Sequence, residues 1–401
     1  ELAAMSHRYE GYSPLDWWRE RELAAWIDVL SSSRLVTQAP TEHIALLVLQ
    51  HQRLYLYRMW QHEHRVAQSI QRNLQPRLAV SDDFAAGLQA LFPASSDNTP
   101  NWQKVACAMA ASGRFTLITG GPGTGKTTTV VRLLALLQQQ ALEQSGQPLR
   151  VRLAAPTGKA AARLTESIGA QIARLPVSDA VRASIPEHVS TLHRLLGSLP
   201  QTRRFRHHAG NPLILDVLVV DEASMIDLEM MDCLLQAMPA HARLILLGDK
   251  DQLASVEAGA VLGELCQYAA QGRYAPETIA YLEELCGEPL SMNGLEPGSL
   301  TANRLEQRTV MLRHSHRFDA LSGIGRLASA VNAMDTQQAK QILSSDVVDV
   351  QSARFTSLKD LIREGLAPYL AHLAAAPQTN SQAPEFQRWA VELLKQFDRF
   401  R

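Results

Sequence analysis

Cysteine is scarce in this sequence, with four residues among 401, all far apart and none in a Cys-x-x-Cys pair. Structural zinc sites and secreted disulfide frameworks both need closely spaced cysteines. The positions Cys107, Cys233, Cys266 and Cys286 therefore argue against both. We expect all four thiols to be reduced and mostly packed in the interior.

Long apolar runs and an excess of charge of either sign are also missing. No run approaches the roughly 20 apolar residues that span a bilayer, and the N-terminus lacks the basic-then-apolar order of a signal peptide. We therefore expect a cytoplasmic protein. Lys and Arg number 39 against 40 Asp and Glu. Any nucleic acid would thus be gripped by a local groove rather than by the overall field.

The first hundred residues differ from the rest, being rich in Trp, Tyr, Gln, His and Arg. Their pattern predicts a helix around 17–30, a short hairpin with arms at 46–49 and 54–57, and a second helix at 63–74. The stretch 93–100, bounded by prolines, is typical of a linker. We interpret residues 1–99 as a small α+β or mostly helical domain that docks onto a partner.

Short apolar runs alternate with helical patterns after Asn101. Runs such as Leu218-Val219-Val220 suit strands buried on both faces of a parallel sheet. The sequence therefore predicts a doubly wound α/β core whose ligand binds at the carboxyl ends of the strands. The expected strands are 115–119, 151–155, 217–220 and 244–247, and the clearest helices are 127–140 and 159–168.

Two stretches interrupt this rhythm. A basic segment at 203–211 is typical of a protruding hairpin, and a polar stretch at 272–304 carries Gly and Pro. We expect a first motor domain at 100–308, with insertions at about 198–212 and 270–305, and a partial second domain at 309–401.

A Gly-x-x-x-x-Gly-Lys-Thr motif runs from Gly120 to Thr127, directly after an expected strand and at the head of an expected helix. This context is the one that a phosphate-binding P-loop requires. Its backbone N–H groups and the helix N-terminus would cradle phosphates, Lys126 would neutralise them, and Thr127 would ligate Mg²⁺. A glycine-rich turn that merely caps a helix is the alternative, and a dinucleotide loop is disfavoured further because Lys126 stands where a third glycine is needed. The expected loop contacts are Gly121, Pro122, Gly123, Thr124, Gly125, Lys126, Thr127 and Thr128.

Polar residues follow two further expected strands. The strand at 217–220 ends in Asp221 and Glu222, where Asp221 can hold Mg²⁺ and Glu222 can polarise the attacking water. The strand at 244–247 ends in a polar loop that carries Gln252, which can lie near the γ-phosphate. A solvated loop side chain is the alternative for Gln252.

These motifs occur in an order that resembles superfamily 1 DNA helicases, in particular the alpha subunits of exodeoxyribonuclease V, from about Asn101 to the end. The stretches that carry the resemblance are 101–104, 120–129, 155–161, 190–197, 220–225, 248–253 and 315–318. The resemblance implies RecA-like motor domains of the P-loop NTPase class that use ATP and Mg²⁺. The first hundred residues resemble the same subunits more weakly.

The resemblance also implies roles for individual residues. Gln103 would recognise adenine, Gln252 would couple the γ-phosphate to the DNA groove, and Arg317 would act as an arginine finger. Thr157, Lys159 and His193 would line the groove for single-stranded DNA. Solvated or ion-paired surface side chains are the alternative for Lys159 and Arg317, and a solvated loop is the alternative for a strand-guiding element at 203–208.

Family membership implies 5′-to-3′ movement on single-stranded DNA, within a heterotrimer that contains a helicase–nuclease chain and a scaffold chain. Nuclease chemistry is expected on another chain, because the Asp221–Glu222 pair is the one carboxylate cluster with suitable spacing. The family also carries a Gln-Gly-bearing DNA motif and a second arginine nearer its C-terminus. Neither occurs before Arg401, and the chain starts at Glu1 rather than Met. We therefore expect either a piece of a longer protein or joined segments of one, or else a chain whose second motor domain is incomplete, so that ATP binding could survive without hydrolysis-driven movement.

Three alternatives remain beside an ATP-dependent helicase subunit of double-strand break repair. One is an assembly module that binds ATP without motor activity. Another is a P-loop enzyme for a small phosphorylated metabolite, which the Gln103, Gln252 and Arg317 set disfavours. The third is a stand-alone or relaxase-type superfamily 1 helicase, which partner binding would distinguish.

Overall fold

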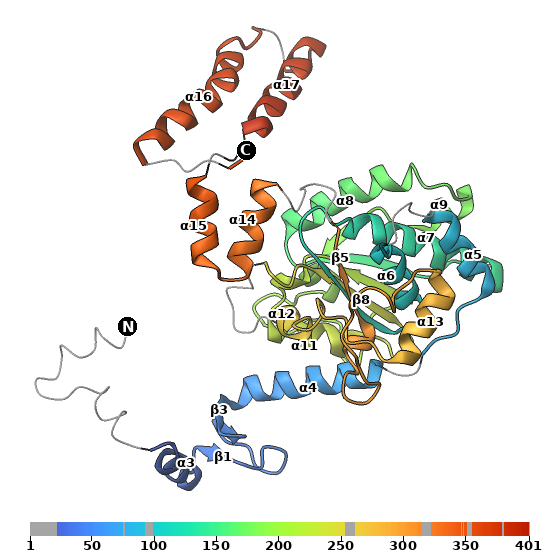
Figure 1. The fold of residues 1–401 in the computed structure, drawn as a ribbon, viewed down its shortest axis with the longest axis vertical. Helices are drawn as coiled ribbons and strands as arrows, with labels where there is room; N and C mark the ends of the chain where they lie inside the picture. Colours follow the sequence, from blue (N-terminus) through green and yellow to red (C-terminus); the bar gives the residue numbers. More distant parts are fainter. Residues whose placement is uncertain are drawn as a thin grey trace, which may run out of the picture. The chain divides into compact units, whose positions relative to one another are not determined.

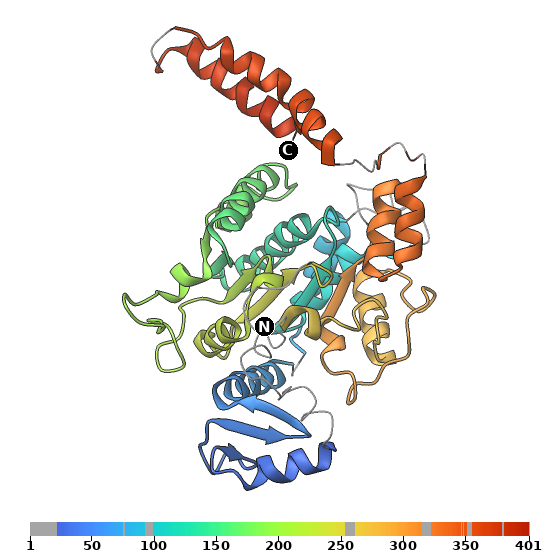
Figure 2. The ribbon, with the colours of Figure 1, turned by 90° about the vertical axis from the view of Figure 1, so that its left-hand side faces the viewer.

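The computed structural model describes residues 22–74, 77–92, 99–252, 261–314, 322–345, 347, 349–350, 355–378 and 381–400. The chain divides into two compact units, Glu1–Arg317 and Phe318–Arg401. The first unit holds a six-stranded sheet with helices on both sides (Figures 1 and 2). The second unit is described below by itself.

All strands of the six-stranded sheet are parallel, in the order β6-β5-β7-β8-β4-β9. The four strands that the sequence predicted are confirmed as β4, β5, β7 and β8. Two strands were missed. The strand at Val189–Thr191 has only three residues, two of them polar, and the strand at Thr309–Leu312 lies where a second domain was expected. The strands are β4 (Phe115–Gly120), β5 (Val151–Ala155), β6 (Val189–Thr191), β7 (Val217–Val220), β8 (Arg243–Gly248) and β9 (Thr309–Leu312).

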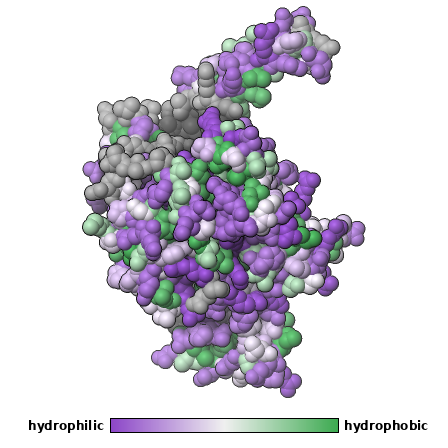
Figure 3. Space-filling view, turned by 90° about the vertical axis from the view of Figure 1, so that its right-hand side faces the viewer, coloured by the Kyte–Doolittle hydropathy of each residue, from purple (hydrophilic) through white to green (hydrophobic). Residues whose placement is uncertain are grey.

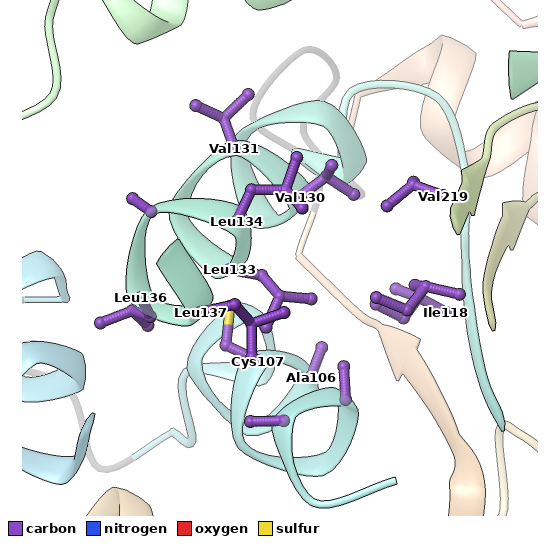
Figure 4. Packing of buried hydrophobic residues seen from close by; sticks show 14 of the residues in the cluster. Ala106, Cys107, Ile118, Val130, Val131, Leu133, Leu134, Leu136, Leu137 and Val219 are labelled. Atoms are coloured by element: carbon purple, nitrogen blue, oxygen red, sulfur yellow. The ribbon is translucent and has the colours of Figure 1, made fainter. Parts of the chain in front are cut away.

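Both faces of the sheet are buried, as the apolar runs predicted. Successive side chains of a strand point to opposite faces, so Val217 and Val219 of β7 belong to one apolar cluster while Leu218 and Val220 belong to the other. In Figure 4, leucines of α7 (Lys126–Ser145) pack near Cys107 of α6 (Trp102–Ala111) and Ile118 of β4. The doubly wound α/β fold with a RecA-like P-loop core is confirmed.

Helices cover each face of the sheet. The helix pattern predicted at 127–140 is α7, and that predicted at 159–168 is α8 (Gly158–Ile172). One face is covered by α6, α7, α8, α5 (Asp82–Leu91), α9 (Asp179–Ser184) and α13 (Pro276–Cys286), and the other by α10 (Leu192–Leu196), the 3-10 turn η2 (Ala223–Met225), α11 (Leu228–Ala237) and α12 (Val261–Leu265).

The two interruptions have different structures. The polar stretch at 272–304 contains α13, whose Leu282 and Cys286 pack into the core, and a second 3-10 turn, η3 (Glu306–Arg308), follows it. The basic stretch forms no ladder. It holds only two isolated antiparallel bridges, Ser198 with Phe205 and His208 with Asn211. The protruding hairpin is therefore a turn-rich excursion, because its glycine and polar residues do not support continuous pairing.

The predicted N-terminal hairpin is confirmed. Strands β2 (Leu47–Gln50) and β3 (Arg53–Leu56) pair antiparallel around His51 and Gln52, both with positive φ, and β1 (Val36–Thr37) adds a parallel edge. The helix expected at 17–30 is present as α3 (Leu23–Ser32) from Leu23 onward, and the residues before 22 lie outside the described range. The helix expected at 63–74 starts earlier, as α4 (Tyr57–Asn73).

The predicted domain boundaries can be compared with the course of the chain. Val66, Ile70 and Leu74, on and just after α4, join the apolar cluster on one face of the six-stranded sheet. At the other end, β9 pairs with β4, so the sheet continues past the boundary expected at 308 as far as Leu312. The linker expected at 93–100 lies outside the described residues except for its last two. The division into three domains stays a prediction.

The described part of the second unit consists of helices. They are α14 (Gly323–Asn332), α15 (Thr336–Ser344), α16 (Phe355–Ala374), which contains Pro368, and α17 (Pro384–Phe400). Across the described residues of the whole chain, no helix has the length and apolar character needed to cross a membrane.

The four cysteines lie mostly in the interior. Cys107, Cys266 and Cys286 are buried and Cys233 is half-buried, which confirms that the cysteines are mostly packed in the interior. The outer face in Figure 3 is mostly hydrophilic, with hydrophobic patches between.

Candidate nucleotide site

The P-loop begins where β4 ends at Gly120 and finishes where α7 starts at Lys126. Gly123 has φ 78° and Gly125 has φ 82°, the left-handed region that glycine adopts without strain. These two residues turn the chain sharply enough for the loop to close at the N-terminus of α7. Free backbone N–H groups and the helix dipole at such a point form an anion site.

The Lys126 ammonium lies over the loop. Its Nζ donates to the carbonyl oxygens of Gly120 at 2.6 Å and Gly121 at 3.2 Å. Thr124 braces the same loop, because its hydroxyl donates to the Gly121 carbonyl at 2.9 Å. Thr127 and Thr128 follow on the first turn of α7 and are half-buried. The sequence-predicted loop residues therefore form one compact cradle.

Gln103, on the first turn of α6, contacts this cradle. Its Nε2 donates to the Thr124 carbonyl at 3.1 Å. A Cβ atom built on Gly125 would stand 2.2 Å from the same Nε2. The residue expected to recognise adenine thus lies directly against the phosphate loop, and Gly125 leaves the space for it.

The acid pair stands at the carboxyl end of β7. The Glu222 backbone N–H donates to Asp221 Oδ1 at 2.9 Å. Burial raises the pKa of the Asp221 carboxyl, the neighbouring Glu222 raises it further, and the Glu222 N–H bond and the Lys126 ammonium act against both. Because Lys126 is close enough to lower the pKa of Asp221, the P-loop and the acid pair belong to one site.

The donor set suits Mg²⁺. Thr127 and Asp221 offer oxygen atoms, and Mg²⁺ in phosphate-transfer sites is held by one or two carboxylates together with phosphates and water. Among the described residues, no group of three or more His, Cys, Asp and Glu could hold a metal by itself. The half-buried Asp221 carboxyl, whose pKa is raised chiefly by desolvation, would be stabilised in its charged form by a cation.

Gln252 lies in the loop after β8. In the sheet, β8 lies between β7, which ends in the acid pair, and β4, which leads to the P-loop. The Gln252 Oε1 accepts a hydrogen bond from the Ser224 hydroxyl at 3.3 Å. Two residues earlier, the Lys250 N–H donates to Thr119 Oγ1 at 3.0 Å, which ties the loop to β4. Arg317, the expected arginine finger, lies outside the described residues.

The expected DNA contacts lie on neighbouring elements. Thr157 caps α8 by accepting from the Ala160 N–H at 3.2 Å, and Lys159 is exposed two residues further on. His193 is exposed on α10, and its ring meets Phe205 edge-on at 5.8 Å. These positions are described, and their contact with DNA stays a prediction.

His193 lines a cavity of about 500 Å³ beneath the basic excursion. Arginines from the excursion and from α4 share this cavity with two acids near the start of α11. The lining includes Arg58, Arg203, Arg204, Phe205, Asp227 and Glu229. The basic stretch singled out in the sequence therefore opens onto a pocket of mixed charge.

Sequence reasoning missed three contributors to the site. Ser224 had been noted only as part of a motif, and Thr119 only as the end of a strand, although both hydroxyls hold the loop of Gln252. Trp102, next to Gln103, lies under the Arg313 guanidinium at 4.5 Å from the ring centroid. A polar residue at the end of an apolar strand was the available signal for Thr119.

Sequence comparison gives an independent description of the chain. The AAA domain family matches residues 103–258, which include the P-loop and the acid pair. The RecBCD enzyme subunit RecD of Haemophilus influenzae is 43% identical over 369 residues, covering 90% of this chain and 54% of that protein. The subunit of the same name from Mycolicibacterium smegmatis is 39% identical over 355 residues, covering 88% and 54%.

Other similarities are narrower. The ATP-dependent RecD2 DNA helicase of Deinococcus radiodurans is 37% identical over 220 residues, 54% of this chain and 26% of that protein. A structure of Pif1 helicase from Bacteroides with ADP-AlF3 and single-stranded DNA covers 77% of this chain and 52% of its own, at 16% identity and a TM-score of 0.29. A TM-score this low carries no argument about function. The chain spans about half the length of the curated relatives that it matches.

Proposed function

We propose, from its similarity to the RecD subunits of RecBCD enzymes, that this chain is part of an ATP-dependent 5′-to-3′ DNA helicase subunit of a RecBCD-type exodeoxyribonuclease V. Its role would lie in double-strand break repair and recombination in the cytoplasm. Its partners would be single-stranded DNA and the helicase–nuclease and scaffold chains of the heterotrimer. The similarity at 37–43% identity over about nine tenths of the chain supports this assignment.

One observation carries the ATPase part of the proposal. The sheet order puts β8 between β7 and β4, and in a parallel sheet the carboxyl ends of these strands share one edge. The P-loop, the loop of Gln252 and the Asp221–Glu222 pair therefore emerge side by side. This arrangement supplies the cation, the acid pair and the polar sensor that phosphoryl transfer uses.

We propose the following division of roles. Gln103 holds adenine, and the loop from Gly121 to Thr128 binds the phosphates. Lys126 neutralises the β- and γ-phosphates, and Glu222 polarises the water that attacks the γ-phosphate.

Thr127 and Asp221 would hold Mg²⁺, which when bound supplies charge neutralisation at the phosphates. Gln252 registers the γ-phosphate, and Arg317 completes the site as an arginine finger. Thr157, Lys159 and His193 contact the backbone of a single strand without reading its bases.

We propose the domain bounds that the sequence predicted, with one addition to the first motor domain. Residues 1–99 would dock onto a partner chain, 100–308 would form the first motor domain together with β9, and the rest would begin the second. The helices of the second unit are compatible with this division.

The test is ATP turnover by the full-length protein with and without single-stranded DNA. We expect stimulation by DNA, and at least a 100-fold loss on Lys126→Ala, about 2.7 kcal/mol of transition-state stabilisation, because charge neutralisation dominates phosphoryl transfer. Lys340→Ala, an exposed lysine on α15, is the matched control and should match the wild type. Strong hydrolysis that is indifferent to DNA contradicts the proposal.

A stand-alone RecD-like helicase is the second candidate, and the similarity to the Deinococcus radiodurans RecD2 helicase favours it. That similarity covers 54% of the chain, against 90% for the Haemophilus influenzae subunit. Co-purification with a helicase–nuclease chain and a scaffold chain would support the heterotrimer. Isolation as a single active chain would support the alternative.

A further inference from the structure

The backbone of Glu222 has an unusual conformation. Its φ of 53° and ψ of 36° lie in the left-handed region, which costs a residue with a side chain about 1–2 kcal/mol. A 3-10 turn, η2, follows at once and is closed by two bonds, from the Met225 N–H to the Glu222 carbonyl at 3.0 Å and from the Ile226 N–H to the Ala223 carbonyl at 3.1 Å. The tight turn therefore fixes the direction in which Glu222 leaves the strand.

The end of β8 lies directly on this turn. A Cβ atom built on Gly248 would stand 3.0 Å from the backbone nitrogen of Ser224, 3.4 Å from that of Ala223 and 2.3 Å from Leu262 Cδ2. Such an approach leaves no room for a side chain at position 248. Because Gly248 has no side chain, the end of β8 packs directly against the backbone of the turn at Ala223 and Ser224. A movement of the strand end would therefore shift the turn.

The described start of the loop beyond Gly248, residues 249–252, is held by hydrogen bonds that involve side chains. Near its start the Lys250 N–H donates to Thr119 Oγ1 at 3.0 Å, within the fully buried strand that leads to the P-loop. Within the loop the Asp251 N–H donates to Asp249 Oδ1 at 3.1 Å. At Gln252, the last described residue of this segment, the Ser224 hydroxyl donates to Oε1 at 3.3 Å.

The hydroxyl of Ser224 is well placed for this task. Ser224 is only 5% exposed, while the side chain of Gln252 is exposed. A buried donor on a rigid turn thus holds a side chain that solvent would otherwise leave mobile. Fixing the oxygen of the Gln252 amide also fixes its NH₂ group, which is the end that can donate to a phosphate.

We infer that Ser224 is a positioning residue that holds Gln252 ready for the γ-phosphate and links it to the turn that orients Glu222. This inference rests on the proposed function, because Gln252 and Glu222 are its acting residues. Nucleotides with a γ-phosphate would be distinguished from those without one through this hydrogen bond. Ser224 would therefore act through Gln252 and not on the nucleotide directly.

The first measurement needs no turnover. The affinities of the full-length protein for ADP and for a non-hydrolysable ATP analogue are titrated, and their ratio reports γ-phosphate recognition. We expect Ser224→Ala to shrink this ratio about threefold to tenfold, the effect of losing one hydrogen bond. Gln252→Ala should shrink it at least as much, and Ser224→Thr, which keeps a hydroxyl, should restore part of it.

A double-variant cycle separates positioning from a general weakening of the fold. Because Ser224 acts through Gln252, the Ser224→Ala/Gln252→Ala protein should discriminate no worse than Gln252→Ala alone. The matched control is Ser69→Ala, a 3% exposed serine on α4 whose hydroxyl accepts from Arg72. It should leave the ratio unchanged.

Turnover provides the second measurement. In the presence of single-stranded DNA, the Ser224→Ala protein should have a kcat about threefold to tenfold below that of the wild type and a KM for ATP within about twofold of it. A Ser224→Ala ratio equal to that of the wild type, or effects that multiply in the double variant, would overturn the inference. The wild type could also show a nucleotide affinity ratio that depends on Ser224 and yet hydrolyse no ATP. That result would refute the proposed function and leave the inference standing.

Discussion

Three residues of the nucleotide site hold left-handed backbone conformations, Gly123 with φ 78°, Gly125 with φ 82° and Glu222 with φ 53°. Glycine adopts this conformation freely, whereas for glutamate it stores strain that the surrounding turn must offset. Strain of this kind concentrates where a side chain has to be aimed. The motif in the sequence predicted which residues act, and the backbone angle of Glu222 came only from the structure.

Gly125→Ala tests the loop at this scale. The new side chain meets both an unfavourable φ and the Gln103 amide, whose Nε2 would stand 2.2 Å from the added carbon. We expect ATP affinity to fall about tenfold, roughly 1.4 kcal/mol, because the loop is strained and Gln103 is displaced. Equilibrium titration of ATP measures this.

Gly158→Ala is its control, since that glycine has helical surroundings and open space around it. It should bind ATP as the wild type does. Equal affinity of the Gly125→Ala protein would show that the contact between Gln103 and the loop is dispensable.

At the scale of elements, the amino ends of β5 and β7 are joined by a carboxylate. Asp216 accepts from the Arg150 backbone N–H at 2.8 Å and from its guanidinium at 3.0 and 2.7 Å, and His241 adds a contact at 3.2 Å. The Arg150 side-chain hydrogen bonds hold the pKa of Asp216 well below its usual range, with smaller contributions from the Arg150 N–H and His241 and with burial acting against them. The pair fixes the register of two central strands.

Asp216→Asn should lower the free energy of unfolding by about 1 kcal/mol at pH 7, since the bidentate pair is well formed but Arg150 is exposed. The folded pKa is lowered, so this stability is complete above the unfolded carboxyl pKa of about 4 and is lost as the pH falls toward the folded value. Denaturant unfolding at several pH values measures the difference, which should shrink below about pH 4.

The control for this pair is Asp179→Asn, at a carboxylate that is 97% exposed beside Arg182. Its effect should be close to zero at every pH. A difference for Asp216→Asn that persists unchanged at pH 2 would contradict an electrostatic origin.

At the scale of the whole molecule, a buried carboxylate connects the N-terminal segment to the motor core. Asp232 on α11 is 3% exposed, and its Oδ2 lies 2.7 Å from His62 Nδ1 and 3.4 Å from Arg65 Nη1, both on α4. Helix α11 follows the turn after the acid pair. The segment proposed to dock onto a partner chain is therefore fastened to an element that continues from the nucleotide site.

Asp232→Asn should destabilise this attachment by about 1–3 kcal/mol, because two donors on α4 lose a charged acceptor in a buried setting. We expect faster proteolysis within α3–β3 and a lower midpoint of thermal unfolding. Glu229→Gln on the same helix is the control, since its contact with Arg58 is 4.0 Å long and exposed. Equal protease resistance of the Asp232→Asn and wild-type proteins would show that apolar packing alone holds α4.

Much of the fold followed from the sequence because its signals are local. Runs such as 217–220 had to be strands buried on both faces, and the P-loop glycines had to turn the chain before a helix. Short elements gave weaker signals: β6 has three residues, and the four-residue β9 lay where a second domain was expected. Its place as a sixth strand depends on pairing with β4, almost 200 residues earlier.

The sequence by itself determined the phosphate loop, the acid pair and the alternation of strands and helices, since glycine conformations, carboxylates and hydrophobic periods act within a few residues. Only the tertiary structure decided which residues meet across the site. Gln103 reaches Thr124, Ser224 holds Gln252, and His62 finds Asp232, over separations of 21, 28 and 170 residues. Such contacts depend on how the sheet stacks its strands, because the strand order brings together residues that no local pattern connects.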